Sequence, residues 1–242
     1  MLALALALVC LLLTAHQIKA ESNQTSTSPD PLLSAAEIAY PPFSIADAQG
    51  RADGFSVALL RAALKAMDRE VTFRTGTWPE VKRLLARGKV QVLPLVGRTS
   101  EREAIFDFTF PYMSLHGAIV VRQATTDIKT LDDLKGRHVA VMAGDNAEEF
   151  LRRQDTDLRI RSTATFKDAL RQLSDGRHDA VVIQRLVALR LIQELELDNL
   201  QVINRPVQGF LQDFCFAVTE GDRDTLALLN EGLSIVMADG TY

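Results

Sequence analysis

The sequence has 242 residues, of which 47% are hydrophobic, and a formal net charge of -4. This apolar share can build a substantial core and excludes a globally disordered chain, and the length allows one large domain or two lobes. Because the charge is only mildly negative and no basic run occurs, nucleic acid is excluded as the expected partner.

An uncharged apolar run, residues 2–15, opens the chain and is followed by polar residues. The run is shorter than the roughly 20 residues that a membrane-spanning helix needs, and it is typical of a secretory signal. We therefore predict a signal peptide at residues 1–20, cleaved after Ala20, and a flexible polar lead-in at residues 21–31. No positive segment precedes the run, so an uncleaved anchor or a lipid attachment stays open as an alternative.

Cysteine and histidine provide neither a disulfide framework nor a metal site. Cleavage would leave Cys215 as the only cysteine, within an apolar run, so we predict a buried free thiol there. The histidines at 116, 138 and 178 are far apart and have no partner at ligand spacing. The sequence therefore predicts no metal and no cofactor.

The first hundred residues alternate between strand and helix patterns. Apolar residues at helical spacing indicate helices, and alternating or continuous apolar runs indicate strands. The predicted elements are strands at residues 32–38, 71–75 and 90–96, and helices at residues 55–67 and 78–87. This order implies a sheet whose strands are joined by helical crossovers.

A second alternating unit follows, from about residue 122 to residue 206. Its predicted strands, including the one that enters it, are 116–122, 138–142, 158–162, 179–183 and 200–204, and its helices begin near residues 130, 147, 165 and 184. The chain closes with a strand at 212–219 and an apolar-faced helix at 222–238. Because no linker rich in Gly, Ser or Pro divides the two units, we predict two α/β lobes joined by extended segments.

One arginine lies just beyond the end of a predicted strand. Arg102 follows Gly97 and two hydroxyl residues, in a loop where free backbone N–H groups are expected. A guanidinium is always charged, and its planar fork matches the two oxygens of a carboxylate. Taken alone, Arg102 could instead form a surface ion pair with Glu101, Glu103 or Asp107. The phenylalanines at 106, 108 and 110 alternate as core residues of a strand do.

Four sequence blocks together resemble the type 2 periplasmic solute-binding proteins, the bacterial extracellular solute-binding protein family 3 of the polar amino-acid binding type. The blocks are YPPF at 40–43 with Gly54-Phe55, residues 97–102 with 106–108, VAVMAG at 139–144, and GRHDAVV at 176–182. The closing DGTY at 239–242 is also typical of that family. The resemblance covers about residues 34–242.

The resemblance implies a two-lobed α/β fold in which each lobe is a mixed sheet flanked by helices. Lobe 1 would hold residues 32–116 and 211–242, and lobe 2 would hold residues 124–204. Segments 117–123 and 205–210 would form the hinge. Ligand would bind in the cleft, and hinge closure would bury it.

The resemblance also implies a set of ligand-binding residues. In this family the arginine at the position of Arg102 grips the ligand carboxylate, aromatic residues flank the ligand side chain, and a helix start in lobe 2 meets the carboxylate. The residues expected to bind ligand are Tyr40, Trp78, Leu95, Gly97, Arg102, Met142, Asn146 and Gln184. Core roles for the two aromatic residues, and helix-cap roles for the two amides, stay open as alternatives.

Gln184 departs from the family pattern. Amino-acid binders carry an acidic residue there, which pairs with the α-ammonium of the ligand. A neutral amide accepts a hydrogen bond but cannot neutralise a cation, and burial of an unpaired ammonium is costly. Glu37, from lobe 1, is the alternative source of negative charge.

The expected function is extracytoplasmic binding of a small carboxylate-bearing solute, such as an amino acid, in the periplasm. The partner would be an ABC importer permease, or a membrane signalling domain for which the chain is the sensor; Gln184 and the early end at Tyr242 favour the sensor slightly. The alternative is a periplasmic dehydratase of prephenate or arogenate, with Glu37 and Asp145 as acid–base candidates. We predict a binding protein and no enzyme.

Overall fold

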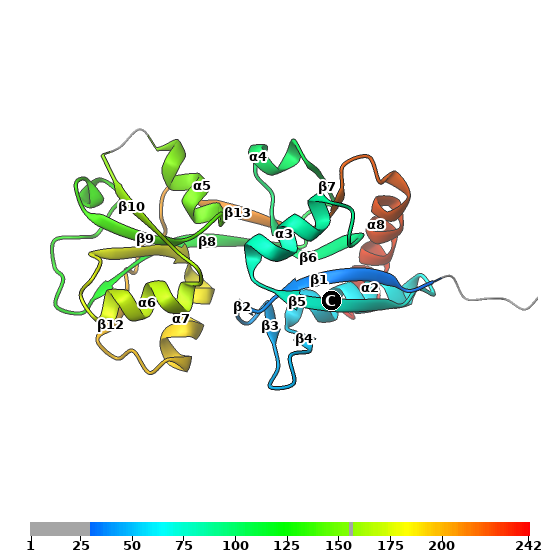
Figure 1. Cartoon of the computed structure of the whole chain (residues 1–242), viewed down its shortest axis with the longest axis horizontal. Helices are drawn as coiled ribbons and strands as arrows, with labels where there is room; N and C mark the ends of the chain where they lie inside the picture. The colour runs from blue at the N-terminus through cyan, green and yellow to red at the C-terminus, as the bar shows by residue number, and fades with distance from the viewer. Residues whose placement is uncertain (1–29, 155–156) are drawn as a thin grey trace, which may run out of the picture. The chain divides into compact units, whose positions relative to one another are not determined.

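The computed structural model describes residues 30–154 and 157–242. The predicted signal peptide, and all but the last two residues of the predicted lead-in, lie outside the described residues. Two α/β lobes are built on one mixed sheet of ten strands (Figure 1). Within the described ranges, no helix is long and apolar enough to cross a membrane.

Lobe 1 has a parallel arrangement at its centre. Strand β1 (Leu32–Glu37) pairs in parallel with both β5 (Val71–Gly76) and β6 (Val92–Gly97). Each connection between parallel strands contains a helix, as such crossovers require: α2 (Phe55–Ala66) precedes β5, and α3 (Trp78–Ala86) precedes β6. The start of α3 is fixed by a capping box between Thr77 and Glu80.

Lobe 2 also has parallel strands joined by helices. Strands β10, β9 and β11 lie side by side in parallel, and β8 and β12 extend the sheet in antiparallel fashion. The elements are η1 (Asp132–Leu134), β9 (His138–Met142), α5 (Asn146–Arg153), β10 (Arg159–Thr163), α6 (Phe166–Ser174), β11 (Ala180–Gln184), α7 (Arg185–Glu194) and β12 (Leu200–Val202).

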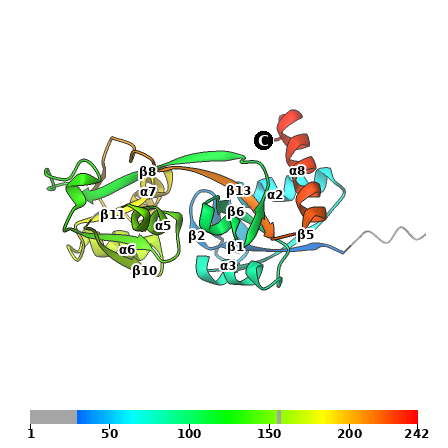
Figure 2. The same ribbon diagram turned by 90° about the horizontal axis from the view of Figure 1, so that it is seen from above.

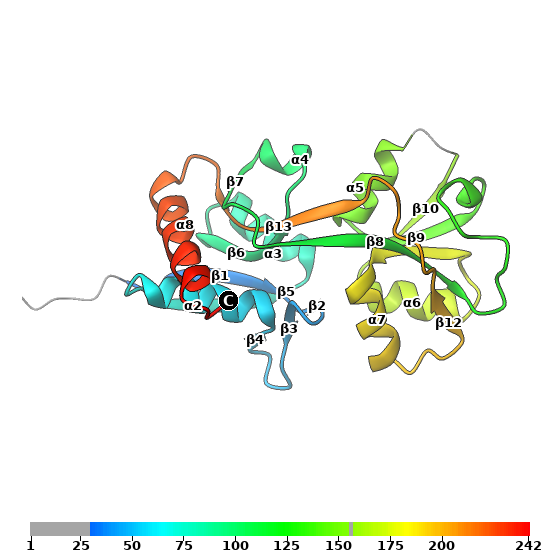
Figure 3. The same cartoon turned by 180° about the vertical axis from the view of Figure 1, so that it is seen from behind.

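Two long strands join the lobes. Strands β8 (Met113–Arg122) and β13 (Leu211–Thr219) pair with each other in antiparallel fashion, and Figures 2 and 3 show them running side by side from one lobe to the other. Strand β13 then pairs with β6 in lobe 1, whereas β8 pairs with β11 in lobe 2. The residue limits expected for the hinge, 117–123 and 205–210, stay a prediction.

The sequence patterns missed several short elements. A small sheet of β2 (Ala39–Tyr40), β3 (Ser44–Ala46) and β4 (Ala52–Asp53) follows β1. A short helix, α4 (Ser100–Glu103), replaces the expected loop, and β7 (Phe106–Phe108) pairs with β13.

The prediction of Phe110 as a core residue is wrong, because β7 ends before it and its side chain is 37% exposed. Thr109 is buried instead, and its hydroxyl accepts a hydrogen bond from Phe216 N.

Cys215 lies in the core, on β13. It is a free thiol, and burial raises its pKa to about 12. Because the thiolate is the reactive form, this cysteine is inert at neutral pH. The prediction of a buried free thiol is confirmed.

Helices α2 and α8 (Arg223–Ala238) pack closely in lobe 1, and Gly232 allows that contact. A Cβ atom at position 232 would lie 2.2 Å from the carbonyl oxygen of Ala63, on the α2 backbone. A backbone atom within a packed helix cannot move aside as the tip of a side chain could. Gly232 is therefore selected by the distance between the two helices.

Substitution Gly232→Ala should lower the free energy of unfolding by about 1–3 kcal/mol, the usual cost of overpacking. The sign is informative because the same change in an exposed helix stabilises by about 1 kcal/mol. Urea unfolding monitored by circular dichroism gives the value. The exposed neighbour Ser234→Ala is the control and should stay within about 0.5 kcal/mol of the wild type; a Gly232→Ala protein as stable as the control would contradict the packing argument.

Candidate ligand-binding site

Most residues expected to bind ligand lie together, between the lobes. Strands β1 and β6 of lobe 1 and β9 and β11 of lobe 2 end near this place, and ligand sites of α/β proteins form at such carboxyl ends. The lining residues are Glu37, Tyr40, Trp78, Leu95, Gly97, Arg102, Asp145, Asn146 and Phe214. Six of the eight predicted residues are among them; Gln184 joins through hydrogen bonds, whereas Met142 is a buried residue of β9 outside the lining.

The cavity itself has a volume of only about 10 Å³. That is about the space of one water molecule. The side chains of the two lobes therefore contact one another directly, and the geometry is that of a closed cleft filled by its own residues.

A chain of side-chain hydrogen bonds crosses between the lobes. Tyr40 Oη donates to Gln184 Oε1, and Gln184 Nε2 donates to Asn146 Oδ1. Gln184 is the N-cap residue of α7, but its side chain makes no capping bond. The cap of α5 is Asp145, so Asn146 is not a cap either. Both amides point into the site, which removes the helix-cap alternative for them.

Arg102, which is 2% exposed, lies at the centre of the site. Its Nη1 donates to Gly97 O at 3.0 Å, its Nη2 to Gly144 O at 3.1 Å, and its Nε to Glu149 Oε1 at 3.1 Å. Its Cζ lies 4.7 Å from the centroid of the Trp78 ring, whose Nε1 also donates to Gly144 O at 2.6 Å. A buried guanidinium requires such a full set of partners.

The surface ion pairs considered for Arg102 are wrong. Glu101 pairs with Arg153, Glu103 pairs with Arg98, and Asp107 accepts a hydrogen bond from a backbone N–H. The actual acidic partner, Glu149, is 47 residues away in sequence. No local pattern marks it, because only the tertiary fold brings α5 to this loop.

Two buried carboxyl groups flank Arg102. Glu37 is 6% exposed and Asp145 is 4% exposed. Burial, together with the charge of Asp145, raises the pKa of Glu37 to about 8, although Arg102 opposes the shift. Burial also raises the pKa of Asp145 to about 6, against the effects of Arg102 and of the hydrogen bond from Ala147 N. A further cation beside these groups would stabilise both carboxylates and lower both pKa values.

Asp145 caps the start of α5, where the sequence predicted that a ligand would bind. The sequence predicted that a ligand carboxylate meets this helix start, where N–H groups are free. The carboxylate of Asp145 itself accepts from Ala147 N at 2.8 Å. The chain therefore supplies its own anion at that position.

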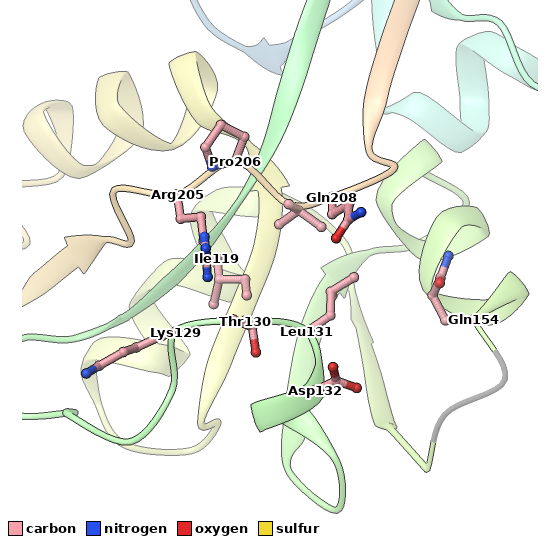
Figure 4. Close-up of a pocket in the computed structure, with 10 residues that line it drawn as sticks. Ile119, Lys129, Thr130, Leu131, Asp132, Gln154, Arg205, Pro206 and Gln208 are labelled. Carbon is pink, nitrogen blue, oxygen red and sulfur yellow. The ribbon is translucent and has the colours of Figure 1, made fainter.

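A larger cavity, of about 510 Å³, lies elsewhere, between lobe 2 and the segments that enter and leave it (Figure 4). It is bounded by Ile119, by Leu131 and its neighbours, and by the segment 205–208, from which the Arg205 side chain extends over the cavity. Its charged residues are exposed, and none of the residues expected to bind ligand lines it. Polar groups converge between the lobes instead, so that region is the candidate site.

The pH dependence of stability should report on Glu37. Its pKa rises from 4.5 to about 8 on folding, so between those values the folded protein holds a proton that the unfolded chain releases. The free energy of unfolding should therefore fall as pH rises from 6.5 to 8, by up to about 1.4 kcal/mol per pH unit for one proton. Asp145 adds to this slope only at lower pH, since its pKa is about 6.

Glu37→Gln cannot ionise and should lose most of that slope, as urea unfolding at pH 6.5 and pH 8 would measure. Glu103→Gln, an exposed acid on α4, is the control and should keep the slope. A wild-type protein that is equally stable at both pH values would show that Glu37 titrates normally.

Two lobes joined by a pair of long strands, with a buried arginine and a polar network between them, define a two-lobed ligand-binding protein. The chain belongs to the bacterial extracellular solute-binding proteins, family 3, whose family model matches residues 32–242. This membership confirms the resemblance and the fold class expected from the sequence.

The relatives and neighbours are named as binding proteins or as a sensor domain. The chain is 31% identical to the L-cystine-binding protein TcyJ of Escherichia coli strain K12, over 87% of this chain and 79% of TcyJ. It is 28% identical to ABC transporter arginine-binding protein 1 of that strain, over 84% of each protein. A histidine kinase sensor domain with similarity to periplasmic binding proteins superposes with a TM-score of 0.84 and 32% identity, covering 89% of this chain and 93% of that one.

An ancestral arginine-binding protein bound to arginine superposes with a TM-score of 0.81 and 29% identity, over 89% of this chain and 96% of its own. Amino-acid binding is therefore the function of the family, and the prediction of a binding protein rather than an enzyme is confirmed. Nothing among these proteins supports the dehydratase alternative.

Proposed function

We propose that this chain is a periplasmic receptor that binds one amino acid between its lobes. The observation that carries the proposal is a fully charged, buried Arg102 flanked by two buried acids, at the place where the strand ends of both lobes meet. Charged groups are retained in a protein interior only when they have partners. A zwitterionic ligand would supply both signs of charge to this set.

Each site residue has a role in the proposed complex. Arg102 binds the ligand carboxylate, with main-chain groups of Leu95 and Gly97 nearby, and Tyr40 and Trp78 flank the ligand. Gln184 and Asn146 provide neutral hydrogen bonds from lobe 2, with Met142 supporting their loop from β9. Glycine at position 97 leaves room for the amide of Asn146, because a Cβ there would lie 2.5 Å from Asn146 Nδ2 and displace that side chain.

The ligand class that best fits the charges is an amino acid with a cationic side chain. Gln184 cannot neutralise an ammonium group, whereas Glu37 and Asp145 each offer a carboxylate when they release their protons. Two acids accommodate two positive groups, the α-ammonium and a cationic side chain. Arginine-binding proteins occur among the relatives and among the structural neighbours, which supports this class.

The closing motion would divide the chain as the sequence predicts. Residues 32–116 with 211–242 would move as lobe 1 and residues 124–204 as lobe 2, about hinge segments 117–123 and 205–210. The closed form would then be presented to an ABC importer permease or to a fused membrane signalling domain. Curated relatives named as ABC transporter binding proteins support the first partner, and the sensor-domain neighbour supports the second.

A thermal-shift and calorimetric comparison of L-arginine, L-citrulline and L-glutamate tests the ligand class. L-Citrulline has nearly the same shape as L-arginine but no side-chain charge, so it should bind at least about tenfold more weakly, a difference of ~1.4 kcal/mol. L-Glutamate should not bind, because its second carboxylate would face Glu37 and Asp145. Equal affinity for the first two ligands would contradict a cationic side-chain site.

Arg102→Ala should weaken binding of any amino acid found in this comparison by at least about 30-fold, since removing one partner of a buried charge pair costs roughly 2–5 kcal/mol. Arg98→Ala is the matched control, because that arginine is nearby on the same loop but 47% exposed and paired with Glu103. Isothermal titration calorimetry measures both. Unchanged affinity in Arg102→Ala would remove this residue from the site.

A further inference from the structure

The three nitrogens of Arg102 are divided between the lobes. Nη1 bonds to Gly97 O, on its own lobe, and this contact anchors the side chain. Nε and Nη2 bond to Glu149 Oε1 and Gly144 O, which both belong to the segment that forms the start of α5 in lobe 2. One whole edge of the guanidinium is therefore turned to lobe 2.

The carboxylate of Glu149, a residue of lobe 2, contacts side chains of lobe 1. Besides Arg102 Nε at 3.1 Å, its carboxylate accepts from Thr99 Oγ1 at 3.0 Å and lies 3.7 Å from Lys82 Nζ. Its side chain is 15% exposed. Figures 1 and 3 show α5 on the side of lobe 2 that faces α3 and α4, the helices that carry Lys82 and Arg102. A carboxylate of lobe 2 thus lies beside two cationic side chains of lobe 1, Lys82 and Arg102.

A carboxylate that binds an arginine with both oxygens uses two N–H groups along one edge of the fork. The edge formed by Nε and Nη2 suits this geometry, and Glu149 and Gly144 O now hold it. When α5 moves away from lobe 1, the same edge becomes free while Gly97 O keeps the side chain in place. Glu149 and Gly144 O are therefore alternatives to a ligand carboxylate on this edge.

We propose that Glu149 is an internal competitor for the ligand carboxylate. It holds the two lobes together through Arg102, and it leaves that edge before a ligand carboxylate binds there. This inference rests on the proposed function for the identity of its competitor, the carboxylate of an amino acid. The closure of the empty protein does not depend on any ligand and can be tested separately.

The charge of Glu149 is essential to closure. Burial lowers the pKa of Lys82, and Arg102 lowers it further, whereas Glu149 opposes this effect. Without the carboxylate, Lys82 and Arg102 would lie close together with neither of them paired to Glu149, and opening would return both to water. Neutralising Glu149 should therefore open the empty protein and expose the Nε–Nη2 edge of Arg102.

Small-angle X-ray scattering of the ligand-free protein tests the closure. Glu149→Gln keeps the side-chain shape and removes only the charge, and the ratio of closed to open molecules should fall about tenfold or more. Glu101→Gln is the matched control, because it removes a different ion pair between the lobes, with Arg153, at 47% and 45% exposure. The control should scatter as the wild type does. Wild-type scattering from Glu149→Gln would overturn the proposal.

A second variant tests the proposal if the first variant does not fold. If Glu149→Gln does not fold, Glu149→Asp shortens the side chain by one methylene and withdraws the carboxylate from Arg102 Nε, with which it pairs at 3.1 Å. Opening of ligand-free Glu149→Asp supports the proposal, and scattering equal to that of the wild type overturns it.

The competition is tested with L-arginine and agmatine, which is the same molecule without the carboxylate. Glu149→Gln should bind L-arginine about tenfold more tightly than the wild type and should change agmatine binding less. Weaker binding of L-arginine would show that Glu149 supports the ligand rather than competing with it, and would overturn the proposal. If the wild type binds no amino acid, the proposed function fails while the scattering result still decides the closure.

Discussion

The permanent charge of Arg102 is the constraint on which the arrangement between the lobes depends. A guanidinium that is 2% exposed cannot lose its proton, so oxygen atoms must surround it in every conformation in which it is buried. Lobe 1 offers Gly97 O, and the other two oxygens come from Gly144 and Glu149 of lobe 2. The position of α5 is thereby linked to that of β6.

Negative charge is more abundant than positive charge around this arginine. Glu149 pairs directly with Arg102, while burial raises the pKa values of Glu37 and Asp145 in spite of the same arginine. The cleft can therefore remain closed with protons on these acids, or with a cation in their place. A proton on each acid, or a bound cation, would each remove the cost of a buried negative charge. Binding of a cationic ligand in the cleft should therefore depend on pH.

The sequence predicted the fold better than it predicted the contacts within the site. Strands, crossover helices and the lobe to which Arg102 belongs followed from periodicity and from family blocks, because those signals are local or collective. Glu149 was missed because a single glutamate on a polar helix face carries no sign of its partner. Phe110 was misplaced since alternation persists in sequence beyond the point where β7 ends. Met142 lies on the expected strand, but strand position does not determine which side chains line a cavity.

The path of β13 has a consequence for how the protein is made. This strand lies between β8 and β6 in the sheet, yet it comes from residues near the end of the chain. Lobe 2 is continuous in sequence and can assemble while the ribosome is still translating. The sheet of lobe 1 cannot be completed until Leu211–Thr219 has emerged from the ribosome, because this strand pairs with one edge of β6. Until then the edges of β6 and β8 that pair with β13 are unpaired, and unpaired strand edges can pair with another chain.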